Sequence, residues 1–304
     1  MDSGRSCPAR NVFDKLSSLA VEWFSYLKIN EARAMIIAVI NNKGGVGKTT
    51  VTCNLAHALG RLGKRVLVVD LDSQCNATTL LIPKEETPSH SLYELLQPEG
   101  PEADLEAYFH PTRYANVFCL PNVPETAALE PRLILGAPNS FFGPRLHLRD
   151  RARARFDLTL MDTPPNLCTF VLCALCAADF ALVPISSRSA FSVKGLIKAV
   201  RLVKEVQAHN NKDLRFLRLL INQVDRRTLI SRALASQIEQ VFREDQVFHT
   251  TIPVNTAFER AEAAGKTLLR YQPGTPGAHA FRELAQELLD ILAMEAGSSR
   301  RDAT

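Results

Sequence analysis

The chain has 304 residues, of which 46% are hydrophobic and 22% are charged. This composition excludes disorder throughout, and the length allows one large α/β domain or two small ones. The net charge of +4 permits a polyanionic partner without indicating one. No apolar run reaches the roughly 18 residues that a membrane span needs, and the N-terminus lacks the pattern of an export signal, so we expect a cytoplasmic protein without a membrane partner.

The first 34 residues precede the first predicted strand and are expected to form an amphipathic helical extension, because apolar residues recur there at helical spacing. Both signs of charge are present, which favours packing on this fold or on a second copy over membrane binding. Met35 could be an alternative translation start, and the sequence leaves this open. The apolar positions are Val12, Phe13, Leu16, Leu19, Ala20, Trp23, Phe24 and Leu27.

From Met35 onward, short β-rich apolar runs alternate with helical patterns, which is typical of a mostly parallel, twisted sheet with helices on both faces. No repeat or linker divides this region, so we expect a single α/β domain at 35–295 and a flexible tail at 296–304. Loops and short helices are expected at 83–113 and 121–145. The predicted strands are 35–41, 65–70, 116–120, 156–162, 180–184, 215–222 and 247–252. The predicted helices are 50–62, 166–178, 192–208, 228–243, 256–264 and 278–294.

Seven cysteines, an odd number without an export signal, favour reduced thiols over a disulfide framework. Cys173 and Cys176 could form a metal or redox pair on one helix face. Their neighbours are apolar, and no second pair follows at zinc spacing. We therefore expect both side chains to pack in the core.

A glycine-rich run, Asn42-Lys43-Gly44-Gly45-Val46-Gly47-Lys48-Thr49-Thr50, follows the first strand and opens the first helix. Glycines let successive backbone N–H groups point at an anion, and the helix N-terminus adds the positive end of its dipole. The run therefore predicts a P-loop for the phosphates of ATP, in which Lys48 reaches the β- and γ-phosphates and Thr49 binds Mg²⁺. Asn42 stands where the strict pattern has glycine.

Acidic residues end two of the apolar strands, where ligands of such sheets bind. Asp162 follows Leu158-Thr159-Leu160-Met161 as in a Walker B strand, and we expect it to hold Mg²⁺ through water. Asp70 and Asp72 lie on one face of the second strand, and one of them could position the attacking water.

Three blocks, 42–50, 70–78 and Asp162-Thr163-Pro164-Pro165, make the sequence resemble the ParA/MinD family of P-loop ATPases with a deviant Walker A motif. The resemblance covers roughly residues 35–295 and implies an ATP-dependent homodimer in which Lys43 reaches the partner's phosphates. A lysine before the turn of the loop cannot easily reach its own nucleotide while Lys48 does, which agrees with that role. The resemblance also implies that Asp72 activates water and that Asn222 contacts adenine. The implied nucleotide-binding set is Gly44, Gly45, Val46, Gly47, Lys48, Thr49, Thr50, Asn222 and Pro253.

Partition ATPases of this family bind nonspecific DNA as ATP dimers, and a ParB-like centromere-binding or adaptor protein stimulates them. The turn Asp225-Arg226-Arg227-Thr228 resembles one that carries a DNA-contacting arginine at the place of Arg227. However, Val254 and Ala257 stand where many chromosomal relatives have arginines. The alternative is that these basic residues form a solvated face. The predicted DNA contacts are Arg226, Arg227, Arg260 and Lys266.

The sequence thus predicts a nucleoid-associated switch ATPase for plasmid or chromosome partition. The last helix carries Glu283, Glu287 and Asp290, so an anionic membrane would repel it. Two other functions stay open: a positioning ATPase for a non-DNA cargo, and a metabolic P-loop enzyme such as an amide-forming synthase, in which 83–145 would shape a substrate pocket.

Overall fold

The computed structural model describes residues 34–97, 104–136, 139–188, 192–225 and 227–301. The helix predicted in the N-terminal extension and the predicted DNA contact Arg226 lie outside these ranges. Within the part of the chain that the structure describes, none of the helices has the length and apolar character needed to span a lipid bilayer.

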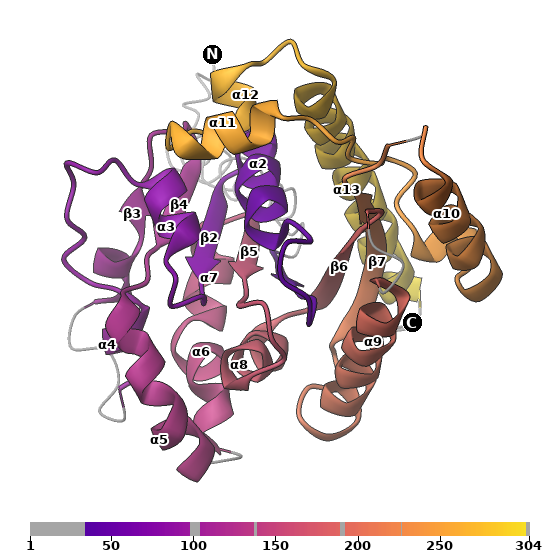
Figure 1. Cartoon of the computed structure of the whole chain (residues 1–304). Coiled ribbons are helices and arrows are strands. Elements are labelled where there is room, and N and C mark those ends of the chain that lie inside the picture. The colour runs from indigo at the N-terminus through magenta and orange to yellow at the C-terminus, as the bar shows by residue number, and fades with distance from the viewer. Residues whose placement is uncertain (1–33, 98–103, 137–138, 189–191, 226, 302–304) are drawn as a thin grey trace, which may run out of the picture.

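A seven-stranded sheet organises the molecule, with the strand order β3-β4-β2-β5-β1-β6-β7 (Figure 1). Every described pair of neighbours is parallel except β3 and β4 at one edge. This confirms the mostly parallel α/β sheet. The strands are β1 Met35–Val39, β2 Val66–Asp70, β3 His110–Pro111, β4 Val117–Leu120, β5 Leu158–Asp162, β6 Phe180–Ser186 and β7 Arg215–Asn222.

Helices connect these strands and cover the sheet. The α-helices are α2 Lys48–Arg61, α3 Asn76–Leu81, α4 Leu92–Leu95, α5 Glu130–Leu135, α6 Gly143–His147, α7 Arg149–Arg155, α8 Thr169–Ala177, α9 Ser192–His209, α10 Leu229–Val241, α11 Ala257–Ala263, α12 Leu268–Tyr271 and α13 Pro276–Arg301. The 3₁₀ turns are η1 Leu105–Tyr108, η2 Pro124–Leu129, η3 Asn139–Phe142 and η4 Glu244–Gln246.

Side chains of the strands alternate between two hydrophobic cores, as the period of a strand requires. Ile37 and Val39 of β1 face the core formed with α2, α3 and α11 to α13, whereas Ile36 and Ala38 face the core formed with α4 to α10. Helices therefore cover both faces of the sheet, as predicted. Cys173 and Cys176 are buried in the second core, which confirms their packing role.

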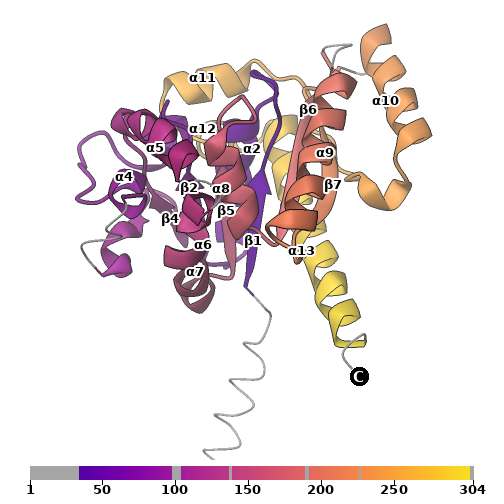
Figure 2. The same ribbon diagram turned by 90° about the horizontal axis from the view of Figure 1, so that it is seen from below.

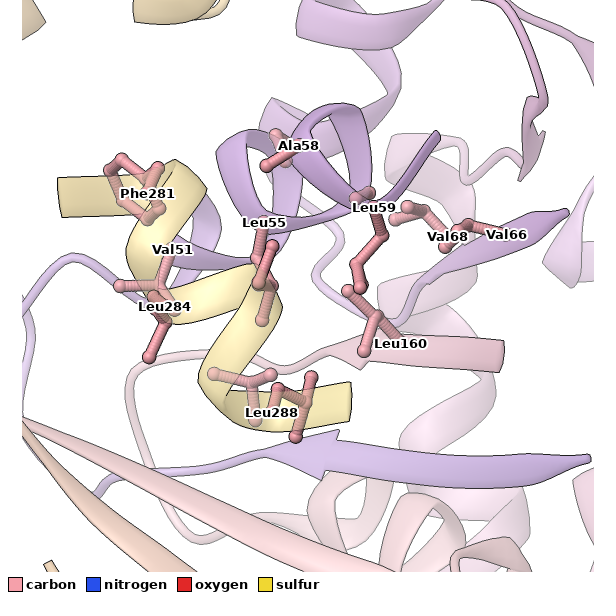
Figure 3. Packing of buried hydrophobic residues seen from close by; sticks show 14 of the residues in the cluster. Val51, Leu55, Ala58, Leu59, Val66, Val68, Leu160, Phe281, Leu284 and Leu288 are labelled. Atoms are coloured by element: carbon pink, nitrogen blue, oxygen red, sulfur yellow. The ribbon is translucent and has the colours of Figure 1, made fainter. Parts of the chain in front are cut away.

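The helix that follows the glycine-rich loop is held on the sheet by α13 (Figure 3). Val51 and Leu55 of α2 contact the layer that Phe281, Leu284 and Leu288 of α13 form, and all five side chains are fully buried. The start of α2 is therefore fixed by apolar packing far from it in the sequence.

The strand predicted at 247–252 is wrong. This segment runs beside β7 and forms an isolated bridge between Val247 and Leu219. The N–H groups of Phe248 and Ile252 donate to carbonyls of β7, but no continuous ladder forms. The N–H groups of His249 and Thr250 donate instead to the two carboxylate oxygens of Glu287 on α13, at 2.7 and 2.9 Å. The carboxylate of Glu287, from a helix distant in the sequence, thus interrupts the hydrogen bonding of this segment with β7.

Two further differences lie at the edges of the fold. The two-residue strand β3 is an antiparallel addition within a region expected to hold only loops and short helices. The last helix continues to Arg301, so helix occupies most of the predicted tail at 296–304.

Replacing Leu284 by alanine tests the packing between α13 and α2. Because the side chain is fully buried, we expect Leu284→Ala to lower the free energy of unfolding by about 2–5 kcal/mol in urea titrations. Met294→Ala on the same helix is the control, since Met294 is 73% exposed. Equal stability of the two variants would contradict this packing.

Candidate nucleotide site

A cavity of about 430 Å³ opens beside the loop that joins β1 to α2, near the carboxyl ends of β1, β2 and β5. Open parallel sheets bind ligands at this edge, where the connections leave a central strand in opposite directions. The cavity is lined by Gly44, Gly45, Gly47, Lys48, Thr49, Thr50, Asp72, Gln74, Asn76, Thr79, Leu80, Thr163, Pro165, Glu262 and Gly265.

The loop adopts a conformation that only glycine takes without strain at two positions. Gly45 and Gly47 have φ angles of 71° and 85°. A Cβ on Gly47 would also lie 2.4 Å from the amide nitrogen of Asn222. Since α2 begins at Lys48, directly after this turn, its N-terminal N–H groups face the cavity.

Two polar side chains at the end of β7 support the loop from below. Asn222 Nδ2 donates to the carbonyl of Val46 at 2.8 Å, and Gln223 Nε2 donates to that of Gly45 at 3.1 Å. Asn222 Oδ1 accepts the N–H of Gln223, so the whole amide is engaged with the protein.

The structure therefore places Asn222 against the phosphate loop. Neither Asn222 nor Pro253 lines the cavity, and Pro253 lies in a separate hollow beside α13. The adenine contact of Asn222 and the covering role of Pro253 stay predictions.

Lys48 and Thr49 line the cavity, and both lie close to Asp162. Thr49 Oγ1 donates to Asp162 Oδ2 at 2.7 Å, and Asp162 is fully buried. Burial, and then the negative charge of Asp70, raise the pKa of Asp162 to about 8. Burial also lowers the pKa of Lys48, against the attraction of Asp162 and Asp72. This group of charges fits a divalent cation, which would stabilise the ionised form of Asp162.

The two carboxylates at the end of β2 have different positions, which the strand pattern alone did not distinguish. Asp70 is fully buried and accepts hydrogen bonds from the N–H and the hydroxyl of Thr78 at 2.8 and 2.7 Å. It also accepts the N–H of Asp72 at 3.1 Å, so it fixes the turn. Asp72 lines the cavity, where a water-positioning carboxylate belongs.

Lys43 belongs to the same loop but is not among the residues that line the cavity. Its backbone carbonyl lies 3.5 Å from Lys48 Nζ, which points into the loop. The contact of Lys43 with the nucleotide of a second copy stays a prediction.

A wall formed by α11 and the turn after it closes one side of the cavity, and sequence reasoning missed it. Glu262 Oε1 accepts a hydrogen bond from Thr50 Oγ1 at 2.5 Å, and Gly265 lines the cavity beside it. No spacing in the sequence pairs residues 50 and 262, because tertiary packing alone brings α11 to α2 (Figure 1).

The wall is anchored to α2 by polar contacts. His57 Nδ1 lies 2.7 Å from Thr267 Oγ1, and Leu268 N donates to Asn54 Oδ1 at 2.8 Å. The ring of His57 also packs on Tyr114, with 4.3 Å between the ring centroids.

The predicted DNA contacts do not form one cluster. Arg227 lies just before α10, whereas Arg260 and Lys266 lie on or next to α11, and Figures 1 and 2 both show these helices on different sides of the molecule. All three side chains are exposed. Arg227 forms a two-pronged ion pair with Asp225, in which both nitrogen–oxygen distances are 2.9 Å.

A parallel sheet, a glycine-rich loop after its central strand, and Lys48 and Thr49 at the start of the next helix define a P-loop nucleotide hydrolase. A family model described as an AAA domain matches residues 34–216. The chain is 40% identical to the chromosome-partitioning ATPase Soj of Thermus thermophilus over 85% of this chain and 96% of that protein. It therefore belongs to the ParA/MinD family of P-loop ATPases.

Solved structures support the same assignment. The cell division ATPase MinD of Pyrococcus furiosus superposes with a TM-score of 0.67 and is 26% identical over 85% of this chain and 99% of that one. A cobyrinic acid a,c-diamide synthase from Mycobacterium smegmatis, with bound ADP and magnesium, gives a TM-score of 0.70 at 28% identity over 84% and 94%. Nucleotide and magnesium are thus ligands of this fold, and the residues around the cavity fit both.

The buried histidine of α2 gives a pH-dependent test of the wall. Burial, and then the charges of Arg61 and Arg270, lower the pKa of His57 to about 4. In the unfolded chain the group titrates near its usual value of about 6.5. Between these values only the unfolded state binds the proton, so stability is lost as the pH falls through this window.

We expect His57→Gln to lose less stability than the unchanged protein between pH 7 and pH 4.5, by on the order of 2 kcal/mol in urea titrations. His279→Gln, at an exposed histidine, is the control and should leave the pH dependence unchanged. The same pH dependence in the His57 variant and the unchanged protein would show that His57 does not stabilise the wall in its neutral form.

Proposed function

We propose that this chain is an ATP-dependent dimerising switch for DNA partition. The observation that carries the proposal is the different position of the two lysines of the loop: Lys48 lines the cavity and Lys43 does not. We assign this second lysine, which does not line the cavity of its own chain, to a nucleotide held by a second copy. The 40% identity to a chromosome-partitioning ATPase, over nearly its whole length, supports the same function.

Each side chain has a defined part in this proposal. The N–H groups of Gly44 to Thr50 and Lys48 bind the phosphates, and Lys43 contributes positive charge across the dimer interface, as an arginine finger does. Asp72 orients the attacking water. Mg²⁺, held by Thr49 and through water by Asp162, would neutralise phosphate charge. Hydrolysis by the chain alone is slow until a centromere-binding partner completes the site.

Nonspecific DNA is the proposed track of the ATP-bound dimer, which makes the protein nucleoid-associated. Arg227 is a better candidate than Arg260 or Lys266, since these two lie near the nucleotide cavity. Lys198, Arg201 and Lys204 are exposed along α9 and add positive charge. The side chain of Arg227 is 90% exposed, so a DNA phosphate can replace the carboxylate of Asp225 at little cost.

Two loop variants test the switch. Lys48→Ala should abolish ATP binding in calorimetry, because it removes the one lysine that lines the cavity among the described residues. Asp72→Ala should bind ATP normally, lower turnover by about 10²-fold or more, and stay on nonspecific DNA in mobility-shift assays with ATP. Equal DNA binding of the Asp72 variant with ATP and with ADP would refute the switch.

The salt dependence of DNA binding tests Arg227. Arg227→Ala should weaken binding of the ATP-bound protein to every DNA sequence alike and lower the slope of log K against log salt by about 1. Arg243→Ala is a matched control, because Arg243 is also exposed and ion-paired, to Asp245. If both variants lost the same affinity, the effect would reflect net charge and not a contact of Arg227.

An amide-forming synthase is the second candidate, and its support is the likeness to the diamide synthase structure. That function predicts ATP turnover that depends on a small carboxylic acid and is indifferent to DNA. Turnover measured with DNA and partner protein, and separately with such substrates, separates the two. A positioning ATPase for another cargo would share the DNA track and differ only in its partner.

A further inference from the structure

The contact between Thr50 and Glu262 brings a carboxylate into a cavity that otherwise suits an anion. The hydroxyl of Thr50 donates to Glu262 Oε1 at 2.5 Å, and both residues line the cavity. A carboxylate cannot accept a hydrogen bond from a phosphate oxygen, and its charge repels one. Glu262 therefore has to face a part of the ligand that carries hydrogen-bond donors.

The order of contacts along the loop tells which part this is. Lys48 and Thr49 mark the β- and γ-phosphate end, where Asp72 and Asp162 also lie. Thr50, the next residue, turns away from Asp162 and towards Glu262 on α11. A nucleotide whose terminal phosphates lie over Lys48 thus extends its α-phosphate and sugar along Thr50 towards Glu262.

The backbone that carries Glu262 is fixed, as a selective contact requires. Arg113 Nη1 donates to the carbonyl of Gly265 at 3.0 Å, and Arg113 Nη2 donates to that of Ile82 at 2.9 Å. Thr267 N donates to the hydroxyl of Tyr114 at 2.9 Å. Together with the contacts of α2 to Thr267 and Leu268, these bonds hold both ends of the segment after Glu262.

The sugar of ATP offers two hydroxyl donors at this end, and an ionised carboxylate accepts such bonds with both oxygens. We propose that Glu262 binds the ribose hydroxyls of the nucleotide and so makes the site selective for ribonucleotides over deoxyribonucleotides. On binding, the ribose takes the place of the Thr50 hydroxyl as the donor to Glu262, and Thr50 turns to the phosphates. The inference rests on the proposal that the cavity binds ATP.

Calorimetric titrations of the protein with ATP, 2′-deoxy-ATP and 3′-deoxy-ATP, each in the presence of Mg²⁺, test this contact. The unchanged protein should bind ATP about tenfold more tightly than the weaker of the two deoxy analogues, as expected for a hydrogen bond to a charged group. Glu262→Ala should bind all three equally. Glu262→Gln should keep part of the preference, because its amide oxygen still accepts a hydrogen bond.

Glu259→Ala is the matched control, because Glu259 is an exposed carboxylate on α11 that does not line the cavity. It should keep the preference of the unchanged protein. A protein without preference for ATP, or a preference that survives in Glu262→Ala, overturns the assignment of Glu262 while leaving ATP binding intact. An equal gain in affinity for all three nucleotides in Glu262→Ala also overturns it, since Glu262 would then only repel phosphate. No binding of ATP to the unchanged protein overturns the proposed function itself.

Discussion

The nucleotide site depends on negative charge that is buried before any nucleotide arrives. Asp70 and Asp162 pair in register at the ends of neighbouring strands, and both are fully buried. Burial raises the pKa of both groups. The charge of Asp70 raises the pKa of Asp162 further, and the charge of Asp72 raises the pKa of Asp70. Lys48 lies in the same low-dielectric region, and its single positive charge cannot neutralise all of these carboxylates. A polyphosphate therefore fits this cavity together with a divalent cation, beside which Thr49 and Asp162 already lie in contact.

The strands and the phosphate loop could be predicted because their signals are local. β1, β2 and β5 are short apolar runs, and Lys48 and Thr49 follow a glycine pattern whose chemistry allows few other uses. The segment 247–252 is a case in which the local sequence signal gave the wrong prediction. Its apolar alternation is that of a strand, but the carboxylate of Glu287 accepts the two N–H groups in the middle of the segment. The sequence of the segment itself gives no sign of its contact with Glu287.

The candidate site also contains residues with local sequence signals and residues that only tertiary packing brings to it. The sequence identified the residues that the loop and the strand ends contribute. The strand pattern alone grouped Asp70 with Asp72, because both follow one strand, and the family resemblance singled out Asp72. The structure shows that Asp70 is fully buried and fixes the turn, whereas Asp72 lines the cavity. Glu262 lies on a correctly predicted helix, yet its contact with Thr50 spans 212 residues and leaves no trace in local spacing. Arg227 and Arg260 were grouped by charge, and the fold separates them.

The support that β7 gives to the phosphate loop has a mechanical consequence. Asn222 and Gln223 hold the carbonyls of Val46 and Gly45, and Gln223 itself has a left-handed backbone with a φ angle of 57°. The chain continues directly from this kink to Asp225 and Arg227 and into α10. Two adjacent side chains thus link the phosphate loop to the segment from which Arg227 extends, so the nucleotide site and that surface share one structural support.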